Sequence, residues 1–304
     1  MGGHREIEVS IVDAFTDRPL AGNAAGVVPD ADGLSEEAMA AIAAELNASE
    51  TAFLLSSEAA DRRIRYFTPT AEIELCGHAT VASHARLLET GAIEPGSHSV
   101  ETDVGVLDVD VDDGGAVWLS GEVATVDPVD IDYARVADAL GADPATLHDV
   151  GVELPIAVAS AGLAFLVVPV NFLEALGSLD PDFGAIESLV DEVGATGLYA
   201  FSFDTLGADS TLHGRAFAPG AGIPEDPVTG TASAAVGAYL REQRAFDGEL
   251  PEEMRFEQGH FVDRPGHVRV RARSDPVSVG GVATTALEGT IAVPEFGSDG
   301  IIEA

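Results

Sequence analysis

The chain has 304 residues, of which 52 are acidic and 15 are basic, so its formal net charge at pH 7 is −37. So negative a surface repels phosphate backbones and anionic lipid headgroups, which argues against nucleic-acid and membrane partners. All 15 basic residues are Arg, and without a Lys amine the chain cannot form a Schiff base or attach pyridoxal phosphate. The acidic excess indicates a halophilic protein, because near 1 M salt a Debye length of about 3 Å screens the repulsion.

Length and cysteine usage narrow the class further. A chain of this length fits two domains of about 150 residues better than one core. The single cysteine, Cys76, excludes an internal disulfide and a Cys-rich metal site, and it indicates a reducing compartment. The first residues show no leader pattern and no apolar run reaches about 18 residues, so we expect a cytoplasmic location.

In chain order, the first half reads as strands with two helices. Strands are predicted at residues 6–14, 26–28, 52–56, 63–67, 100–111 and 116–119. Ser35, followed by Glu36 and Glu37 and an Ala-rich run, predicts a capped helix to residue 46. Small and apolar residues at helical spacing predict a buried helix over residues 77–88. Residues 121–132, rich in Asp, Val and Pro, are interpreted as a linker.

The second half repeats this theme. Helices are predicted at residues 132–140, 183–193 and 228–241, with strands around 155–168, 198–203, 212–217, 255–258, 268–272, 277–279 and 283–287. This order favours an α/β (α+β) protein of two similar lobes, each a barrel-like, mostly antiparallel sheet around a central helix. We place the lobes at residues 1–122 and 123–304, with the last strands able to pack on the first lobe.

Three residues of the first half are candidates for acid–base chemistry. Glu50 precedes an apolar stretch, and burial there would raise its pKa towards neutrality, although a lone Glu more often lies solvated on the surface. Cys76 stands where the small-residue helix begins, which lowers a thiol pKa, but a free Cys is as often a buried apolar residue. His78 could bind substrate or donate a proton.

The second half and the first loop supply further polar candidates. Asp226 precedes Pro227, and this pair is typical of a helix N-cap with Pro at the first position, which needs no function. Asn23 follows Gly22 in a turn, yet its amide could bind a carboxylate or hydroxyl. The eight His residues form no short-spaced ligand set, so we expect no metal. Dinucleotide and serine-hydrolase motifs are missing as well.

The motifs taken together resemble one family. They are residues 12–23 (VDAFTDRPLAGN), 49–53 (SETAF), 65–80 (RYFTPTAEIELCGHAT), 225–232 (EDPVTGTA) and 257–259 (EQG). In order and spacing this set resembles the PhzF (phenazine biosynthesis) family from about residue 6 to 289. The resemblance implies the diaminopimelate-epimerase-like fold, with the active site in the cleft between two lobes, no cofactor and a homodimer.

The same resemblance implies roles for single residues. Glu50 matches the family's acid–base glutamate, His78 its motif histidine and Asp226 its second aspartate. Gly77 and Gly230 match backbone cradles for a carboxylate, and Asn23, Cys76 and Thr231 complete the expected substrate-binding set. Related epimerases place a cysteine at each helix start, and Asp226 is taken to occupy the second of these places. Thr231 stands where the family often has serine, which keeps the hydroxyl and adds a methyl group to the pocket. Ser233 stands where many members have histidine, and this difference argues against the phenazine precursor as substrate.

The resulting hypothesis is a cofactor-independent isomerase that moves a proton on a small carboxylate-bearing substrate through Glu50. One alternative is an epimerase or racemase that uses Cys76 on one side and Asp226 or Glu50 on the other. A different class of alternative is a non-catalytic protein that binds a metabolite.

Overall fold

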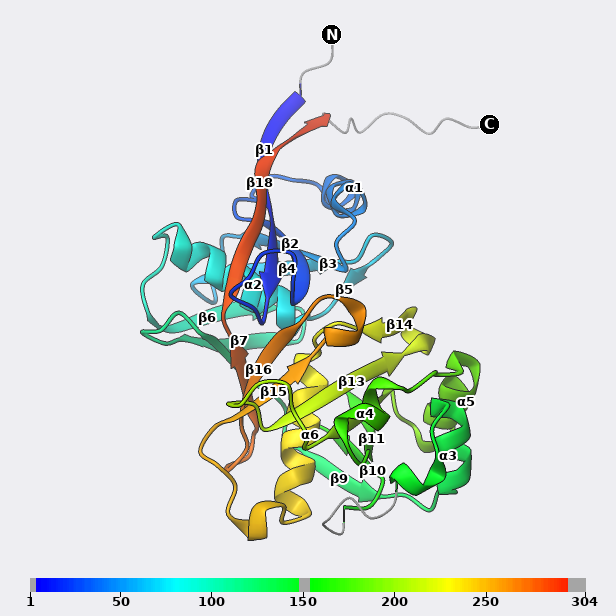
Figure 1. Ribbon diagram of the computed structural model, residues 1–304. Helices are drawn as coiled ribbons and strands as arrows, with labels where there is room; N and C mark the ends of the chain where they lie inside the picture. Colours follow the sequence, from blue (N-terminus) through cyan, green and yellow to red (C-terminus); the bar gives the residue numbers. More distant parts are fainter. Residues whose placement is uncertain (1–3, 148–153, 295–304) are drawn as a thin grey trace, which may run out of the picture. The chain divides into compact units, whose positions relative to one another are not determined.

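The computed structural model of the protein describes residues 4–147 and 154–294 (Figure 1). Contacts within the chain divide it into two compact units. Unit 1 takes its described residues from the segments Met1–Leu20, Ala24–Val117 and Val282–Ala304, and unit 2 from Ala21–Asn23 and Trp118–Gly281. The chain therefore returns to unit 1 at its end, and three residues of an early loop belong to unit 2.

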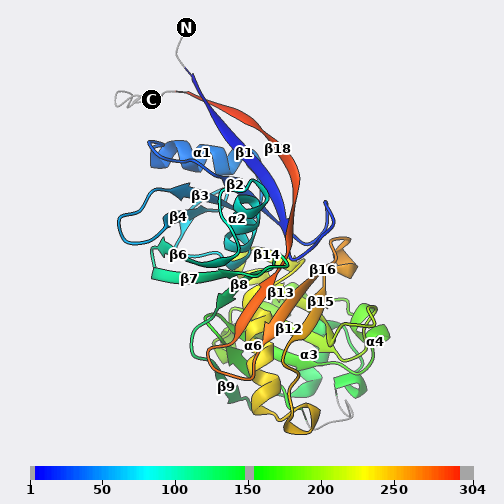
Figure 2. The same cartoon turned by 90° about the vertical axis from the view of Figure 1, so that its left-hand side faces the viewer.

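Unit 1 is a sheet with two helices. Its strands are β1 (His4–Ala14), β2 (Asn23–Val28, of which Asn23 belongs to unit 2), β3 (Glu50–Leu55), β4 (Arg62–Phe67), β5 (Glu72–Ile73), β6 (Gly96–Thr102), β7 (Gly105–Val111) and β18 (Ala283–Pro294). Its helices are α1 (Glu36–Leu46) and α2 (Gly77–Glu89). β1 and β18 run antiparallel side by side, as Figure 2 shows. The β8 strand (Val117–Ser120) starts at the last residue of this part of unit 1.

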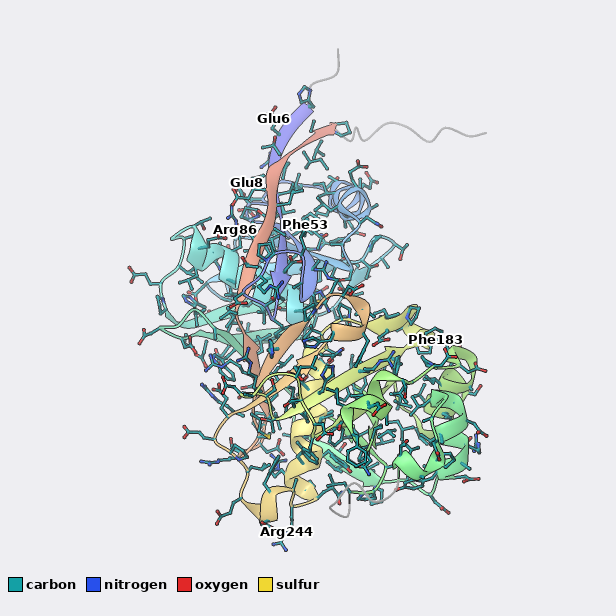
Figure 3. The ribbon with its side chains drawn as sticks, in the orientation of Figure 1. Glu6, Glu8, Phe53, Arg86, Phe183 and Arg244 are labelled. Atoms are coloured by element: carbon teal, nitrogen blue, oxygen red, sulfur yellow. The ribbon has the colours of Figure 1, made fainter. Side chains whose placement is uncertain are left out.

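The α1 helix forms where its cap predicts. Ser35 has extended backbone, and its hydroxyl oxygen accepts a hydrogen bond from the Ala38 N–H at 3.2 Å, which satisfies one of the free donors of the first turn. The apolar side of α1 packs on the sheet through Met39 and Ile42, against a core that includes Phe53, labelled in Figure 3. The sequence prediction of this helix is confirmed.

The α2 helix is central to unit 1, because the sheet contacts it on several sides. Every residue from Ala79 to Leu87 is buried, which explains the Ala, Val and Ser at these positions. Arg86, labelled in Figure 3, ties α2 to the sheet through ion pairs with Glu8 of β1 and Glu288 of β18, and it also pairs with Glu89 of α2 itself. Only a helix with small side chains can be enclosed so closely by a sheet. Because α2 is packed on several sides, its first turn is held in a fixed place.

Unit 2 has the same kind of architecture with more elements. Its strands are β9 (Thr125–Pro128), β10 (Ala157–Ser160), β11 (Ala164–Pro169), β12 (Gly197–Ser202), β13 (Leu212–Ala218), β14 (Ile223–Asp226), β15 (Met254–Gln258), β16 (Gly266–Arg271) and β17 (Ser278–Gly281). Its helices are α3 (Tyr133–Leu140), α4 (Leu173–Gly177), α5 (Phe183–Val193) and α6 (Gly230–Glu242). All residues of α6 from Ala232 to Leu240 are buried, as in α2.

The pairing of the strands shows that the two units repeat one plan. In unit 1, β2 runs parallel to β3, β3 antiparallel to β4, and β4 parallel to β6, with β5 and α2 between the last two in sequence. In unit 2, β11, β12, β13 and β15 pair in the same senses, with β14 and α6 in the corresponding places. The predicted fold class, two similar lobes each with a mostly antiparallel sheet around one helix, is confirmed.

Two local predictions need correction. The stretch of residues 121–132, interpreted as a linker, contains the strand β9, which pairs antiparallel with β10 inside unit 2. Its Val and Pro residues fit an edge-like strand as well as a loop, and only the partner strand decides between them. The helix predicted from residue 228 begins at Gly230 with Thr229 as its N-cap, so Asp226 is the last residue of β14 and caps no helix.

Candidate active site

The start of α2 carries the first group of candidate residues. Cys76 is the N-cap, in extended backbone (φ −138°, ψ 113°), and its side chain caps no N–H. Thr80 fastens this turn, because its hydroxyl donates to the Cys76 carbonyl oxygen at 2.7 Å. A Cβ atom added at Gly77 would meet nothing within 4 Å. The first-turn amides of a helix have no carbonyl partner within it, and here the space beside Gly77 leaves room for a ligand.

Glu50 lies against this helix start from the first position of β3. Its Oε2 is 3.1 Å from Nε2 of His78, and the two side chains are 15% and 13% exposed. The Ser49 hydroxyl oxygen is 3.2 Å from the same nitrogen and donates to the Ala24 carbonyl. On the other side of the ring, Cys76 Sγ is 3.4 Å from Nδ1. The structure therefore brings Glu50, Cys76 and His78 into one cluster, and it adds as a neighbour Ser49, which the sequence analysis used only as part of the SETAF motif.

The charges of this cluster follow from its contacts. Burial raises the pKa of Glu50, but the positively charged His78 beside it, together with the nearby Ser49 and Cys76 side chains, lowers this pKa by more. Burial lowers the pKa of His78, yet Cys76 and Glu50 together hold this pKa well above its ordinary value. Near neutral pH the imidazole thus carries the proton and Glu50 is ionised. The expectation that burial alone would raise the Glu50 pKa is wrong, because the sequence did not show its histidine partner.

One oxygen of Glu50 is available for chemistry. Among the residues that the structure describes, the buried Oε2 has no partner in hydrogen-bond geometry, so its 3.1 Å approach to His78 is an ion-pair contact with poor alignment. A buried carboxylate oxygen without a hydrogen bond is costly. Such an atom at a site of paired charges is typical of a group that acts on a ligand.

The second group of candidates lies in unit 2 and is held differently. Asp226 Oδ1 accepts a hydrogen bond of 2.9 Å from the side-chain amide of Asn23, which also donates to the Val228 carbonyl. The Thr229 hydroxyl donates to Oδ2 of Asp226. Both carboxylate oxygens therefore accept hydrogen bonds, and Asn23 is a direct hydrogen-bond partner of Asp226.

Gln258 fixes the backbone of the same turn. Its Oε1 accepts from the Thr229 N–H at 3.2 Å, and its Nε2 donates to the Asp226 carbonyl oxygen at 2.7 Å and to the Thr229 hydroxyl at 3.1 Å. Gly230 and Thr231 follow as the first two residues of α6 and are half-buried. Sequence reasoning used Gln258 only as part of the EQG motif and assigned it no role. A Gln beside a buried Glu at the end of a strand was the available signal.

The repeated strand pairing shows which positions of the two units correspond. Thr51 pairs with Phe67 in unit 1 as Leu198 pairs with Phe217 in unit 2, so the preceding residues, Glu50 and Gly197, are equivalent. The helix starts align in the same way, since the hydroxyls of Thr80 and Ser233 donate to the N-cap carbonyls four residues earlier. The positions of Glu50, Cys76 and His78 are thus taken in unit 2 by Gly197, Thr229 and Thr231. Asp226 does not occupy the place of a second cysteine.

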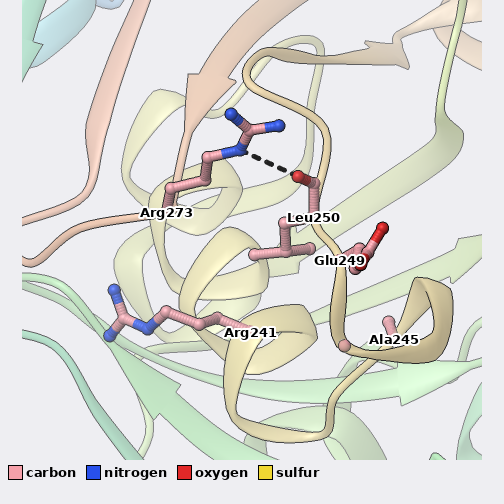
Figure 4. A pocket seen from close by; sticks show the side chains of 6 residues that line it. Arg241, Ala245, Glu249, Leu250 and Arg273 are labelled. Carbon is pink, nitrogen blue, oxygen red and sulfur yellow. Dashed lines mark hydrogen bonds between the residues drawn. The ribbon is translucent and has the colours of Figure 1, made fainter.

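A separate pocket of about 360 Å³ lies in unit 2 (Figure 4). It is lined by Arg241, Ala245, Gly248, Glu249, Leu250 and Arg273. The Arg273 Nε donates to the Leu250 carbonyl and Arg241 donates to the carbonyls of Ala272 and Ser274. These guanidinium groups therefore help to hold the backbone that follows α6 and the backbone that follows β16. The pocket is lined by no residue of the two groups described above.

The fold defines the class of protein. A hydroxyproline epimerase from Agrobacterium vitis, solved with bound trans-4-hydroxy-L-proline, is 15% identical, with a TM-score of 0.59 over 98% of this chain and 94% of that one. At this identity the likeness shows the fold alone, and it is the diaminopimelate-epimerase-like fold predicted from the sequence. In the described part of the chain, no helix is long and apolar enough to span a lipid bilayer.

Sequence comparisons give the family. The model of the PhzC-PhzF family, phenazine biosynthesis-like protein, matches residues 12–289, and the chain belongs to this family. It is 36% identical over 296 residues to the uncharacterized isomerase YfhB of Bacillus subtilis, covering 96% of this chain and 98% of that protein. A PhzF family structure from Bacillus anthracis is 33% identical, with a TM-score of 0.85 over 94% of this chain and 99% of that one. The protein is thus an enzyme of the isomerase or epimerase type that acts on a small molecule.

Proposed function

We propose that the protein is a cofactor-independent isomerase in which Glu50 removes a proton from one carbon of a small carboxylate-bearing substrate and returns it to another. The observation that carries this proposal is the ionised Glu50 with an oxygen outside hydrogen-bond geometry, paired with a protonated His78. An ionised carboxylate can accept a proton. The neighbouring imidazolium supplies a positive charge that stabilises the negative charge developing on the substrate.

The steps balance without an outside reagent. Glu50 Oε2 takes the proton from carbon, and the electron pair of the broken C–H bond delocalises into the substrate's unsaturated or carboxyl system. The charge of His78 and the free amides of the first turn of α2 stabilise this developing negative charge. The neutral Glu50 then delivers the same proton to a different carbon, which relocates the double bond and restores the ionised carboxylate. No electrons are gained or lost, so no redox cofactor is required.

The start of α6 is proposed to bind substrate without moving a proton. Both oxygens of Asp226 already accept hydrogen bonds from Asn23 and Thr229, so this carboxylate is positioned before any ligand arrives. We assign it the role of accepting a hydrogen bond from a polar substrate group. The amides near Gly230 and the Thr231 hydroxyl are assigned to further polar groups of the substrate.

The epimerase alternative needs a second proton carrier. In unit 2 the position equivalent to Glu50 is Gly197 and that of Cys76 is Thr229, neither of which titrates near neutral pH. Cys76 itself lies within 4.8 Å of Glu50 and in the same unit. An epimerase would therefore have to pair Cys76 with Glu50 from the same cluster, or with Asp226, whose two oxygens already accept hydrogen bonds. A single Glu50 is sufficient for a proton shift on one face of the substrate.

The decisive experiment is proton exchange in D₂O. Small unsaturated and amino carboxylic acids are incubated with the protein in molar salt and analysed by NMR and mass spectrometry, beside the Glu50→Gln variant. Glu58→Gln is the matched control, because Glu58 is exposed and the change removes the same charge. A relocated double bond that depends on Glu50 supports the proposal. Deuterium with inversion at one carbon would instead establish the epimerase, and ligand binding without any exchange would establish a metabolite-binding protein.

We also propose a homodimer that resides in the cytoplasm. The family resemblance and the lone Cys76 support these two statements, and the net charge of −37 adds a condition. Like-charged subunits repel at low salt, so screening must favour their association. Light scattering should give twice the chain's mass in molar salt and a smaller mass after the salt concentration is lowered. A single-chain mass at every salt concentration would contradict the dimer.

A further inference from the structure

The cluster in unit 1 combines three kinds of metal donor. Glu50 offers a carboxylate oxygen, Cys76 a thiol sulfur and His78 an imidazole nitrogen, and these atoms all lie within 4.8 Å of one another. Only Cys76 and His78 are neighbours in the sequence, and the third donor lies 26 residues before Cys76, at the first position of β3. Thiolate, imidazole and carboxylate are the three side-chain ligands that Zn²⁺ uses in proteins.

The distances fit one tetrahedral ion. With Zn–S near 2.3 Å and Zn–N and Zn–O near 2.0–2.1 Å, tetrahedral donors are about 3.3–3.6 Å apart. Nε2 of His78 is 3.1 Å from Glu50 Oε2 and 4.0 Å from Cys76 Sγ. These two distances need to change by at most about 0.5 Å, and the Glu50–Cys76 donor separation, which is within 4.8 Å, needs to shorten by up to about 1.2 Å. Changes of this size are within the reach of side-chain adjustment. Three protein ligands would leave the fourth position of the ion open.

We infer that Glu50, Cys76 and His78 form a binding site for Zn²⁺, and that the bound ion inhibits the enzyme. The site includes the Glu50 oxygen that has no hydrogen bond in the described structure, and a metal ion satisfies this atom as a hydrogen bond would. The inhibition rests on the proposed function, since coordination withdraws Glu50 and His78 from proton transfer. The binding does not depend on that function.

Donor chemistry separates this site from the rest of an acidic surface. The chain has 52 acidic residues, and exposed carboxylates bind Mg²⁺ and Ca²⁺ through hard oxygen contacts. A sulfur and an imidazole nitrogen select Zn²⁺ over both ions. Unit 2 serves as an internal comparison, because Thr229, Thr231 and Gly197 at the equivalent positions provide no such set. We therefore expect one Zn²⁺ site per chain when Mg²⁺ is present in large excess.

Calorimetry and cobalt absorption test the binding. The protein is titrated with Zn²⁺ in molar NaCl with excess Mg²⁺, and with Co²⁺ as a coloured substitute for Zn²⁺. We expect one Zn²⁺ per chain, a Kd raised about 100-fold or more by Cys76→Ser or His78→Gln, and a thiolate-to-cobalt absorption band that Cys76→Ser removes. Glu58→Gln should leave all three readouts unchanged. Zn²⁺ binding that survives Cys76→Ser, or no binding in the presence of Mg²⁺, overturns the inference.

Proton exchange tests the inhibition separately. Turnover of a substrate found in the D₂O experiment should fall as Zn²⁺ occupies the site, with half-inhibition at the calorimetric Kd, and a chelator should restore it. Exchange that is unchanged or accelerated by bound Zn²⁺ would refute inhibition and leave the binding in place. If the wild-type protein catalyses no exchange at all, the proposed function fails, whereas calorimetry and the cobalt spectrum still decide whether the Zn²⁺ site exists.

Discussion

The starts of α2 and α6 occupy equivalent places in a repeated plan, yet the carboxylates beside them are held differently. At α2, the side chains of Glu50, His78 and Cys76 lie in one cluster, and the Glu50 carboxylate keeps an oxygen outside hydrogen-bond geometry. At α6, Asp226 is fixed by Asn23 and Thr229, with both carboxylate oxygens engaged. This difference supports the proposal that Asp226 positions a ligand and that Glu50 reacts with it.

This difference teaches how a duplicated architecture becomes asymmetric. The strand register equates Glu50 with Gly197, and a Cβ atom at Gly197 would lie 2.7 Å from the Phe217 carbonyl oxygen. A side chain as large as Glu cannot stand there without moving the backbone of β13. Unit 2 thus excludes a second proton carrier at this position by packing, which supports the proposal that Glu50 alone moves the proton.

The largest effect expected from this comparison is at Glu50. Glu50→Gln removes the proton acceptor but keeps the size of the side chain, so kcat should fall about 10²–10⁴-fold, the usual contribution of a general base. Circular dichroism should show an unchanged fold, and Glu58→Gln should keep wild-type kcat. A Glu50→Gln enzyme within threefold of the wild type would refute the assignment.

A smaller kinetic effect is expected at Asp226. Asp226→Asn keeps one carbonyl oxygen, so it loses one of the bonds that Asn23 and Thr229 donate, and we expect a decrease in kcat/KM of about tenfold. Asp209→Asn, an exposed residue with the same change, is the control. If Asp226→Asn lost as much activity as Glu50→Gln, the distinction between a reacting and a positioning carboxylate would be wrong.

The packing difference predicts unequal effects on stability. Gly197→Ala places a Cβ against the backbone and should lower the free energy of unfolding by about 1–3 kcal/mol. Gly77→Ala meets nothing within 4 Å and should change it by about 1 kcal/mol or less. Urea denaturation in molar salt measures the free energy of unfolding of both variants. Equal losses at the two glycines would show that packing does not explain the asymmetry.

The smallest effect is a pH dependence of stability from the His78–Glu50 pair. The folded-state pKa of Glu50 is lowered, so its contribution is present above its unfolded pKa and is lost as pH falls. The folded-state pKa of His78 is raised, so its contribution is complete below its unfolded pKa and is lost as pH rises through the folded value. The melting-temperature difference between wild type and His78→Gln should therefore be greatest between about pH 4.5 and 6.5. A difference that grows steadily above pH 7 would contradict this charge assignment.

The sequence predicted those elements well whose stability depends on residues close together in the chain. The Ser35 cap and the small residues of the two central helices predicted α1, α2 and α6 almost to the residue, because caps and close packing act within one helix. The β9 strand was mistaken for a linker, since a strand is defined by a partner that the sequence does not identify. The cap assigned to Asp226 failed for a similar reason: β14 extends to this residue and delays the helix to Gly230.

The sequence by itself determined the acidic, Lys-free composition, the repeat of two small-residue helices and the identity of Glu50, Cys76, His78 and Asp226 as candidates. Only the tertiary structure decided which partners surround each carboxylate. The pKa of Glu50 depends on His78, 28 residues away, and the engagement of Asp226 depends on Asn23, 203 residues away. Charge and hydrogen-bond energies depend on distances of a few ångströms, and chain folding sets these distances between residues that are remote in sequence.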